Sequence, residues 1–194
     1  MDRLRGRAIF LDRDGVLNVR PPEHEYVRSA AEFHWLPGAA QGAARLGRAG
    51  YLLTVVSNQR GLARGLVTRD VLEEIEVMIQ DELRAQGARI EAFRYCPHDL
   101  DAGCSCRKPQ PGMILALAEE LSLDTSASWT IGDSVSDMAA GRAAGTRTEL
   151  VGDEWSSGIP EGSGADLAAP SLLAASELIL SQGEARPGPG RARG

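Results

Sequence analysis

Short apolar runs alternate with amphipathic segments along most of this chain, and this alternation limits the folds open to it. The strand-like runs lie at 8–11, 51–56, 92–95, 128–131 and 148–151. Segments with helical spacing lie at 39–46, 68–86, 112–121, 136–144 and 172–180. Repeated strand and helix units with short connections favour a parallel sheet with helices on both faces. We therefore predict an α/β fold.

Four polar clusters follow the predicted strands, directly or at a short distance. They occupy 12–18, 57–60, 104–109 and 132–137. In parallel sheets of this kind, ligands bind outside the carboxyl ends of the strands. We therefore expect the four clusters to converge on one rim of the sheet.

Length and charge restrict the organisation and the partners of the chain. The 194 residues suit one domain, which we expect over 1–181, followed by a disordered tail over 182–194 that is rich in Gly, Pro and Arg. The net charge of -6 removes the general attraction to nucleic acid. A charged start with only a short apolar run predicts neither a signal peptide nor a membrane span. The expected state is a cytoplasmic monomer with no nucleic-acid or membrane partner.

The first polar cluster contains two aspartates separated by one residue. Asp12 and Asp14 follow the apolar run at 8–11, and Gly15 comes next. A turn explains this pattern without any chemistry, because Asp favours loops and Gly permits positive φ. The chemical interpretation gives one carboxylate to nucleophilic attack and metal binding and the other to general acid and base catalysis, as phosphoryl transfer needs.

The second cluster contains Ser57, Asn58 and Gln59 at the end of the second apolar run. These residues form either a polar turn or a set of donors. A hydroxyl, an amide and backbone N–H groups are the donors that the oxygens of a transferring phosphoryl group require.

The third and fourth clusters add cations and further carboxylates. Arg107 and Lys108 are either a solvated charge pair or an anion-binding pair, in which Lys supplies a compact charge and Arg grips a second anionic group. The serines around Asp133 and Asp137 are typical helix caps. The carboxylates can also bind a hard cation such as Mg²⁺, with Asp133 on the metal and Asp137 in support.

All three cysteines of the chain lie in one short loop, at 96–106, together with a histidine. Cys96 and His98 form a C-x-H pair, and Cys104 and Cys106 form a C-x-C pair. Three thiols cannot close a disulfide framework. Three thiolates and one imidazole complete a tetrahedral Zn²⁺ site with no open position, so we predict a structural zinc that stiffens the loop preceding Lys108.

The order of these motifs resembles the haloacid dehalogenase (HAD) superfamily of phosphatases. The matching motifs are DRDGVLN at 12–18, SNQ at 57–59, RKP at 107–109 and GDSVSD at 132–137. The resemblance implies a Rossmann-like HAD fold with a minimal cap. It also implies that Asp12 attacks phosphorus, while Asp14 protonates the departing sugar oxygen and later activates water.

The same resemblance implies the ligands of the metal and of the phosphoryl group. Mg²⁺ is expected on the Asp12 carboxylate, the Asp14 backbone carbonyl and Asp133. The phosphoryl oxygens are expected on residues of the second and third motifs, namely Ser57, Asn58, Gln59, Arg107 and Lys108.

Within the superfamily, the zinc loop and the run that follows the second motif are most similar to the phosphatases of heptose 1,7-bisphosphate. That group releases the C7 phosphate, which leaves heptose 1-phosphate. Arg60, Arg64 and Arg107 are candidate partners for the phosphate that is not cleaved. Histidinol-phosphate or another small sugar phosphate remains an alternative substrate, and a non-catalytic zinc-stabilised binding module is a further one. The preferred anomer and the role of Asn18 stay open.

Overall fold

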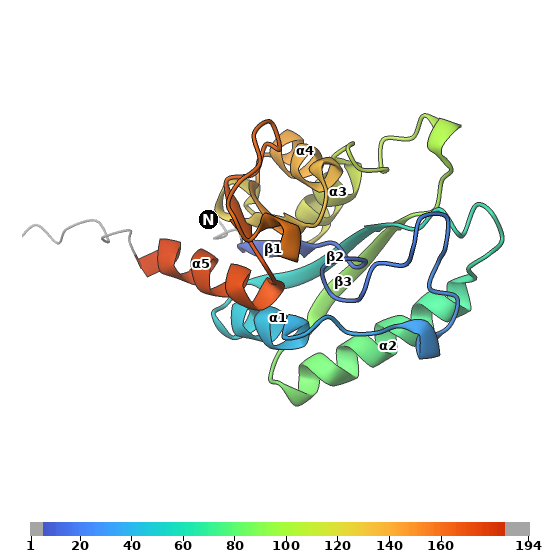
Figure 1. Cartoon of the computed structure of the whole chain (residues 1–194), viewed down its shortest axis with the longest axis horizontal. Coiled ribbons are helices and arrows are strands. Elements are labelled where there is room, and N and C mark those ends of the chain that lie inside the picture. Colours follow the sequence, from blue (N-terminus) through green and yellow to red (C-terminus); the bar gives the residue numbers. More distant parts are fainter. Residues whose placement is uncertain (1–5, 185–194) are drawn as a thin grey trace, which may run out of the picture.

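The computed structural model describes residues 6–184 as a parallel sheet covered by helices on both faces (Figure 1). The six strands stand in the order β3-β2-β1-β4-β5-β6. Their bounds are Ala8–Leu11 for β1, Leu52–Asn58 for β2, Ile90–Cys96 for β3, Trp129–Gly132 for β4, Arg147–Val151 for β5 and Leu167–Ala169 for β6. All neighbouring strands run parallel, which confirms the α/β prediction.

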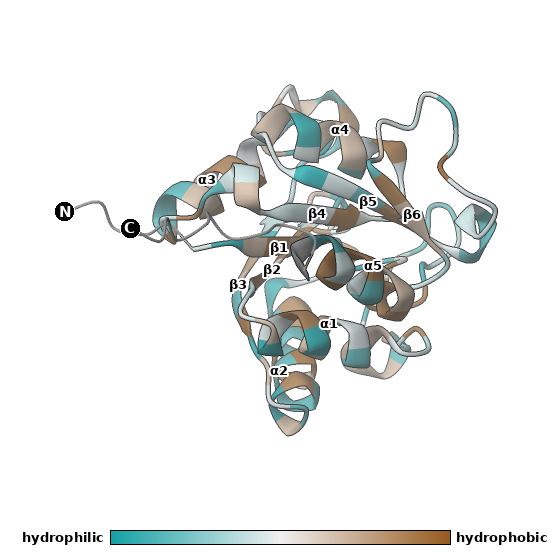
Figure 2. Ribbon diagram, turned by 90° about the vertical axis from the view of Figure 1, so that its left-hand side faces the viewer, coloured by the Kyte–Doolittle hydropathy of each residue, from teal (hydrophilic) through white to brown (hydrophobic). Residues whose placement is uncertain are grey.

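The helices form two layers. One face of the sheet carries α1 (Ala39–Arg48), α2 (Arg69–Ala85) and α5 (Leu172–Glu184), and the other carries α3 (Gly112–Glu120) and α4 (Val135–Ala144) (Figures 1 and 2). The apolar residues of α2 recur every three or four positions and are buried at Leu72, Ile75, Ile79 and Leu83. Thr68 caps this helix by accepting a hydrogen bond from the backbone N–H of Val71 at 3.3 Å.

The predicted strands and helices are all present, most with ends displaced by one or two residues. Two differences have local causes. Strand β6, Leu167–Ala169, was not predicted, because a run of three apolar residues is too short to show a periodicity. Helix α5 continues to Glu184, so the prediction that the tail starts at 182 was wrong for 182–184; the rest of the predicted tail lies outside the described residues.

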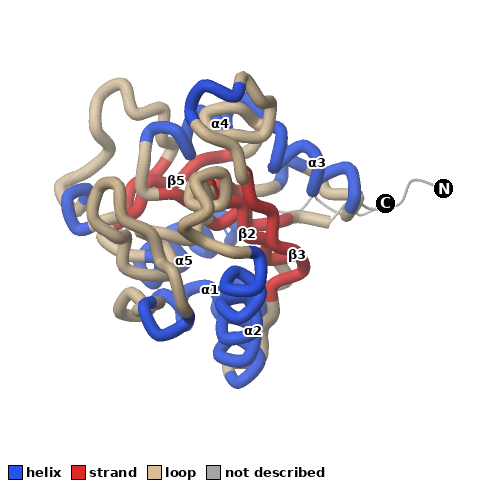
Figure 3. The backbone as a smooth tube through the Cα atoms, turned by 90° about the vertical axis from the view of Figure 1, so that its right-hand side faces the viewer, coloured by secondary structure: helices blue, strands red, loops and turns tan. Residues whose placement is uncertain are grey.

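The connections at the carboxyl ends of the strands are long on the β1 and β3 sides. Residues 12–38 link β1 to α1 and include the 3₁₀ helix η1 (Ala30–Glu32). Residues 97–111 link β3 to α3 and include the 3₁₀ helix η2 (Leu100–Ala102). These loops gather over one end of the sheet in Figure 3. Among residues 6–184, no helix is both long and apolar enough to cross a bilayer.

Candidate active site

A cavity of about 210 Å³ opens at the carboxyl ends of the strands. Its lining draws on each of the four polar clusters: Asp12, Arg13 and Asp14 come from the first, Ser57, Asn58 and Gln59 from the second, Lys108 from the third, and Ser134, Ser136 and Asp137 from the fourth. The predicted convergence on one rim is therefore confirmed.

Lys108 is buried between two carboxylates at the floor of this cavity. Its ammonium nitrogen lies 2.9 Å from Oδ1 of Asp12 and 2.5 Å from Oδ1 of Asp137, and it donates to the backbone carbonyl of Val56 at 3.0 Å. Burial by itself would lower the pKa of Lys108, but Asp12 and Asp137 raise it above its ordinary value. The side chain is thus a permanent cation beside Asp12.

Asp12 directly follows β1, and its side chain is almost fully enclosed. Burial raises the pKa of Asp12, the charge of Lys108 opposes this change, and the nearby Asp137 and Asp14 reinforce it. Its Oδ1 also accepts a hydrogen bond from the backbone N–H of Arg13 at 2.7 Å, which fixes the carboxylate.

Asp14 is bound by three donors, none of which is Lys108. Arg13 contacts Oδ1 of Asp14 through Nη2 at 2.8 Å, Asn18 donates to the same oxygen at 2.9 Å, and Gln59 donates to Oδ2 at 3.0 Å. Arg13 is itself only 1% exposed. The two aspartates therefore occupy different environments, although one residue separates them.

A second group of carboxylates faces the same region. One oxygen each from Asp12, Asp133 and Asp137 lies within 4.8 Å of the others, and all three residues are buried. Burial raises the pKa of Asp133 to about 8, the charge of Asp12 adds to this, and Arg20 opposes it. Oxygen ligands around a buried point that concentrates negative charge suit a hard divalent cation.

Two glycines let these carboxylates approach. Gly15 has φ +87°, and a Cβ built on it would lie 1.7 Å from Oδ2 of Asp133. A Cβ on Gly132 would lie 2.2 Å from the Cβ of Asp137. Any side chain at either position would displace a carboxylate.

The fourth cluster combines a helix cap with the carboxylate site. Oδ2 of Asp137 accepts from the Ser134 hydroxyl at 2.5 Å and from the Ser134 backbone N–H at 3.2 Å, closing a capping box at the start of α4. Oδ1 of Asp137 faces Lys108. The cap therefore orients the carboxylate towards the cavity.

The second cluster is divided between the cavity and its support. Ser57 is buried at the end of β2 and accepts from the Gln59 amide at 3.1 Å. The amide of Asn58 is bonded twice to the backbone of Lys108: its oxygen accepts from the N–H at 3.1 Å, and its nitrogen donates to the carbonyl at 3.2 Å. In this arrangement Asn58 positions the lysine.

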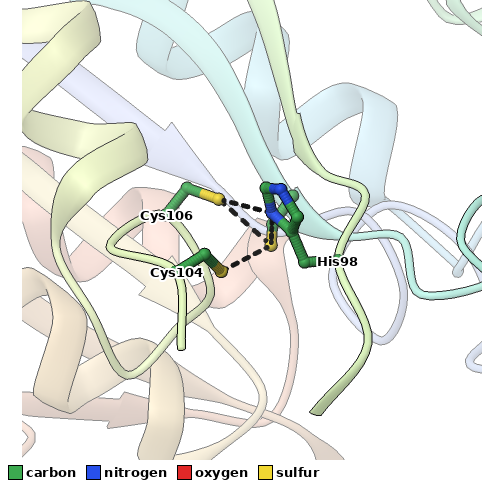
Figure 4. Close-up of side chains that lie close together, drawn as sticks. His98, Cys104 and Cys106 are labelled. Carbon is green, nitrogen blue, oxygen red and sulfur yellow. Dashed lines mark hydrogen bonds between the residues drawn. The ribbon is translucent and has the colours of Figure 1, made fainter. Parts of the chain in front are cut away.

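The cysteines and His98 form a compact cluster beside this rim (Figure 4). The Sγ of Cys96 lies 3.7 Å from that of Cys104 and 3.3 Å from that of Cys106, and Nδ1 of His98 lies 3.2 Å from Sγ of Cys106. Tetrahedral zinc ligands at bond lengths of about 2.0 to 2.3 Å stand roughly 3.5 to 3.8 Å apart. The cluster has the composition and the size of a site that could hold a metal ion.

The arginines that the sequence suggested for a second phosphate lie elsewhere. Nε of Arg60 is 2.5 Å and Nε of Arg64 is 3.4 Å from the carboxylate of Asp99, and Arg107 donates to the carbonyl of His98 at 3.3 Å. None of these three arginines lines the 210 Å³ cavity. The contacts of Arg60 and Arg64 attach the loop that carries the cysteines to the loop after β2, and the contact of Arg107 lies within the cysteine loop.

Two residues near the site, Asn18 and Arg20, had no assigned role in the sequence, and Arg13 was expected only as a supporting residue. Asn18 and the buried Arg13 orient Asp14, and Arg20 lies 2.5 Å from Oδ1 of Asp133. Asn18 and Arg13 lie within the first motif, and this proximity was the only sequence signal for them. Nothing in the local pattern links Arg20 to a residue more than a hundred positions away.

The strand order explains how these groups meet. Strands β1 and β4 are neighbours at the centre of the sheet, so Asp12 and Asp133 leave adjacent strands at the same rim, with Lys108 buried against the first of them. This placement defines the class of HAD-like hydrolases.

Comparisons with known proteins support this class and narrow it. The HAD-hydrolase-like family model matches residues 105–172. D-glycero-beta-D-manno-heptose-1,7-bisphosphate 7-phosphatase of Rhodopseudomonas palustris is 45% identical over 148 residues, covering 73% of this chain and 81% of that protein. The protein of the same name from Pseudomonas aeruginosa is 38% identical over 143 residues, covering 74% of this chain and 79% of that protein.

A solved structure agrees with these relatives. The crystal structure of D,D-heptose 1,7-bisphosphate phosphatase from B. bronchiseptica, complexed with magnesium and phosphate, matches with a TM-score of 0.81 and 36% identity, covering 91% of this chain and 99% of that chain. The chain belongs to the heptose-1,7-bisphosphate 7-phosphatase family of HAD-like hydrolases.

Proposed function

We propose that this protein is a Mg²⁺-dependent phosphatase that removes the C7 phosphate of D-glycero-D-manno-heptose 1,7-bisphosphate and leaves heptose 1-phosphate. The observation that carries the proposal is the separation of Asp12 and Asp14 into two environments within one cavity, the first beside Lys108 and the second beside Arg13, Asn18 and Gln59. Relatives that are 38% to 45% identical bear the name of this activity.

The two aspartates divide the chemistry between them. A carboxylate oxygen of Asp12 forms a bond to phosphorus as the bond from phosphorus to the sugar oxygen breaks, and Asp14 gives its proton to that oxygen. Asp14 then takes a proton from water, whose oxygen attacks the aspartyl-phosphate. Inorganic phosphate leaves, and the Asp12 carboxylate is restored.

The phosphoryl oxygens meet fixed donors in this arrangement. Lys108 supplies a buried positive charge, and Ser57 supplies a hydroxyl at the end of β2. Gln59 lines the same cavity, and Asn58 holds the backbone of Lys108. Arg107, expected from the sequence in this set, donates to the carbonyl of His98 outside the cavity, so we leave it out of the proposed phosphate-binding donors. Donors that are already in position cost no reorganisation when charge develops on the phosphoryl group.

The acidic residues fit a magnesium site. Asp12, the backbone carbonyl of Asp14 and Asp133 would hold Mg²⁺, and Asp137 would support it. When bound, Mg²⁺ neutralises charge on the phosphoryl group and on the attacking carboxylate. Cys96, His98, Cys104 and Cys106 would hold a structural Zn²⁺, because a closed set of four ligands leaves no position for a substrate.

The remaining expectations complete the proposal. The chain as far as the end of α5 at Glu184 would form a single phosphatase domain acting as a cytoplasmic monomer on a small phosphorylated sugar. The relatives carry the beta anomer in their name, and we extend that preference to this chain.

Two experiments test the function. The first measures steady-state phosphate release from both anomers of the heptose bisphosphate and from histidinol-phosphate; faster turnover of histidinol-phosphate would replace the proposed substrate. The second replaces Asp12 and Asp14 separately by Asn. Each change removes a group that takes part in bond making or proton transfer, so we expect kcat to fall at least a hundredfold. Near-normal turnover by either variant would contradict the assigned roles.

A further inference from the structure

Arg20 stands where the proposed metal site meets open solvent. Its Nη2 lies 2.5 Å from Oδ1 of Asp133, and the Arg20 side chain is 54% exposed while that of Asp133 is 9% exposed. Arg20 also lines the 210 Å³ cavity that contains Asp12 and Lys108. One exposed cation therefore neutralises a buried carboxylate that the proposed function assigns to Mg²⁺.

The other cations of the cavity are already committed. Among the described residues, Arg13, Arg20 and Lys108 are the cationic side chains that line it. Arg13 is bound to Asp14, and Lys108 is enclosed by Asp12 and Asp137. Both are buried, whereas Arg20 reaches solvent. Only Arg20 can change its partner without exposing a buried charge.

Arg20 also lines a second cavity, but that cavity is unsuited to bind an anion from solution. This cavity, of about 340 Å³, is lined by Asp133, Asp153 and Glu154, and Arg20 is the one cation in its described lining. Three carboxylates repel a phosphate there. A phosphorylated ligand therefore has to meet Arg20 from the side of the cavity that contains Lys108.

We propose that Arg20 is the specificity residue that binds the phosphate that is not cleaved. Before Mg²⁺ binds, Arg20 forms an ion pair with Asp133, and Mg²⁺ binding to that carboxylate releases it. The substrate part of this inference depends on the proposed function. A guanidinium and a divalent cation compete for the carboxylate of Asp133. The ion pair that must break is half-exposed on the Arg20 side, which limits its contribution to about fivefold in an equilibrium constant. The released guanidinium then presents a planar fork of donors that matches a phosphate.

The test compares Arg20→Gln with a matched control, Arg28→Gln. Arg28 is an exposed arginine of the same loop that lines neither cavity. Calorimetric titration of the substrate-free proteins with Mg²⁺ measures the competition at Asp133. Steady-state kinetics with heptose 1,7-bisphosphate and with heptose 7-phosphate, which lacks the second phosphate, measures specificity.

The proposal predicts opposite effects on the two ligands. Arg20→Gln lowers the Kd for Mg²⁺ about two- to fivefold, and it raises KM for the bisphosphate about tenfold more than KM for heptose 7-phosphate, with kcat affected less than KM. Arg20→Lys keeps the positive charge without the planar fork of donors, so its Kd for Mg²⁺ and its KM values should lie between those of the wild type and Arg20→Gln. Arg28→Gln matches the wild type in both measurements.

Two results would overturn the proposal separately. An unchanged or higher Kd for Mg²⁺ in Arg20→Gln would show that Arg20 and Mg²⁺ do not compete for Asp133. An equal rise in KM for both sugars would show that Arg20 does not recognise the second phosphate. If the wild-type protein does not hydrolyse the bisphosphate, the proposed function and the substrate role of Arg20 fail together, and the Mg²⁺ titration still decides the competition.

Discussion

Glu149 places a carboxylate inside the apolar layer between the sheet and its helices, and we predict that this residue makes folding strongly dependent on pH. It lies in β5, between Ile131 of β4 and Leu167 of β6 in the strand register, and it is 0% exposed. Those two neighbours pack in the core that α1 and α5 cover. Neither carboxylate oxygen of Glu149 has a hydrogen-bond partner among the described residues.

The magnitude follows from the difference between two pKa values. Burial raises the pKa of Glu149 from 4.5 to about 8, and Arg147 opposes the change only in part. Because the folded protein binds this proton more tightly than the unfolded chain, the stability that the protonated group provides is complete below pH 4.5 and is lost as the pH rises towards 8. Between pH 5.5 and 7.5 the loss is on the order of 2 to 3 kcal/mol.

Replacing Glu149 by Gln tests this reasoning, because Gln has nearly the same shape and does not titrate. Urea unfolding of both proteins at pH 5.5, 6.5 and 7.5 gives the difference in the free energy of unfolding at each pH. Asp12 and Asp133 contribute equally to the pH dependence of stability in both proteins, so their contributions cancel in that difference. We expect the free energy of unfolding of Glu149→Gln to increase by about 1 kcal/mol relative to that of the wild type for each unit by which the pH is raised.

The result that would refute the argument is a difference between the two proteins that stays constant from pH 5.5 to 7.5. A constant difference would mean that Glu149 keeps the same charge in the folded and unfolded chains. A second variant, Glu149→Val, adds a check on the environment: an apolar side chain there should stabilise the protein at pH 7.5, since it removes an unpaired buried carboxylate.

Three further changes address the active site. Gly15→Ala places a Cβ on the Asp133 carboxylate and should raise the concentration of Mg²⁺ needed for half-maximal activity at least tenfold; an unchanged requirement would contradict the metal assignment. Asn58→Ala removes two hydrogen bonds to the Lys108 backbone, so chemical unfolding should show a loss of about 1 to 3 kcal/mol together with a lower kcat, and a loss of stability alone would deny it a positioning role. Cys104→Ala should abolish bound zinc in elemental analysis and greatly weaken activity while circular dichroism stays native; full activity in zinc-free protein would contradict this.

The fold could be predicted because its signals are local. The segment 68–86 shows the helical period and a capping Thr68, and the helix occupies Arg69–Ala85. Strand β6 lacked such a signal, since its three residues are fixed by pairing with β5 and not by their own pattern. Local patterns therefore identify elements that would be recognisable alone, and they miss elements that exist only through a neighbour.

The same distinction applies to the site. Parallel strands bring their carboxyl ends to one rim, so the meeting of the four clusters could be predicted from the strand assignments. The particular partners could not: Arg60 pairs with Asp99, and Asn58 holds the backbone of Lys108 across fifty positions. Both pairs depend on where loops of irregular shape return to the sheet, and no periodicity encodes that.

The cysteine cluster connects the sheet to the lysine through a short chain of contacts. Cys96 is the last residue of β3 and pairs in register with Asn58 of β2, so the sheet fixes both. Cys106 lies 3.3 Å from Cys96 in space, and Lys108 follows it by two residues in the sequence. The backbone of Lys108 is therefore held from one side by the cluster and from the other by Asn58. Loss of a metal ion from the cluster would release only the first of these restraints, so its effect should reach the position of Lys108 before it reaches the stability of the sheet.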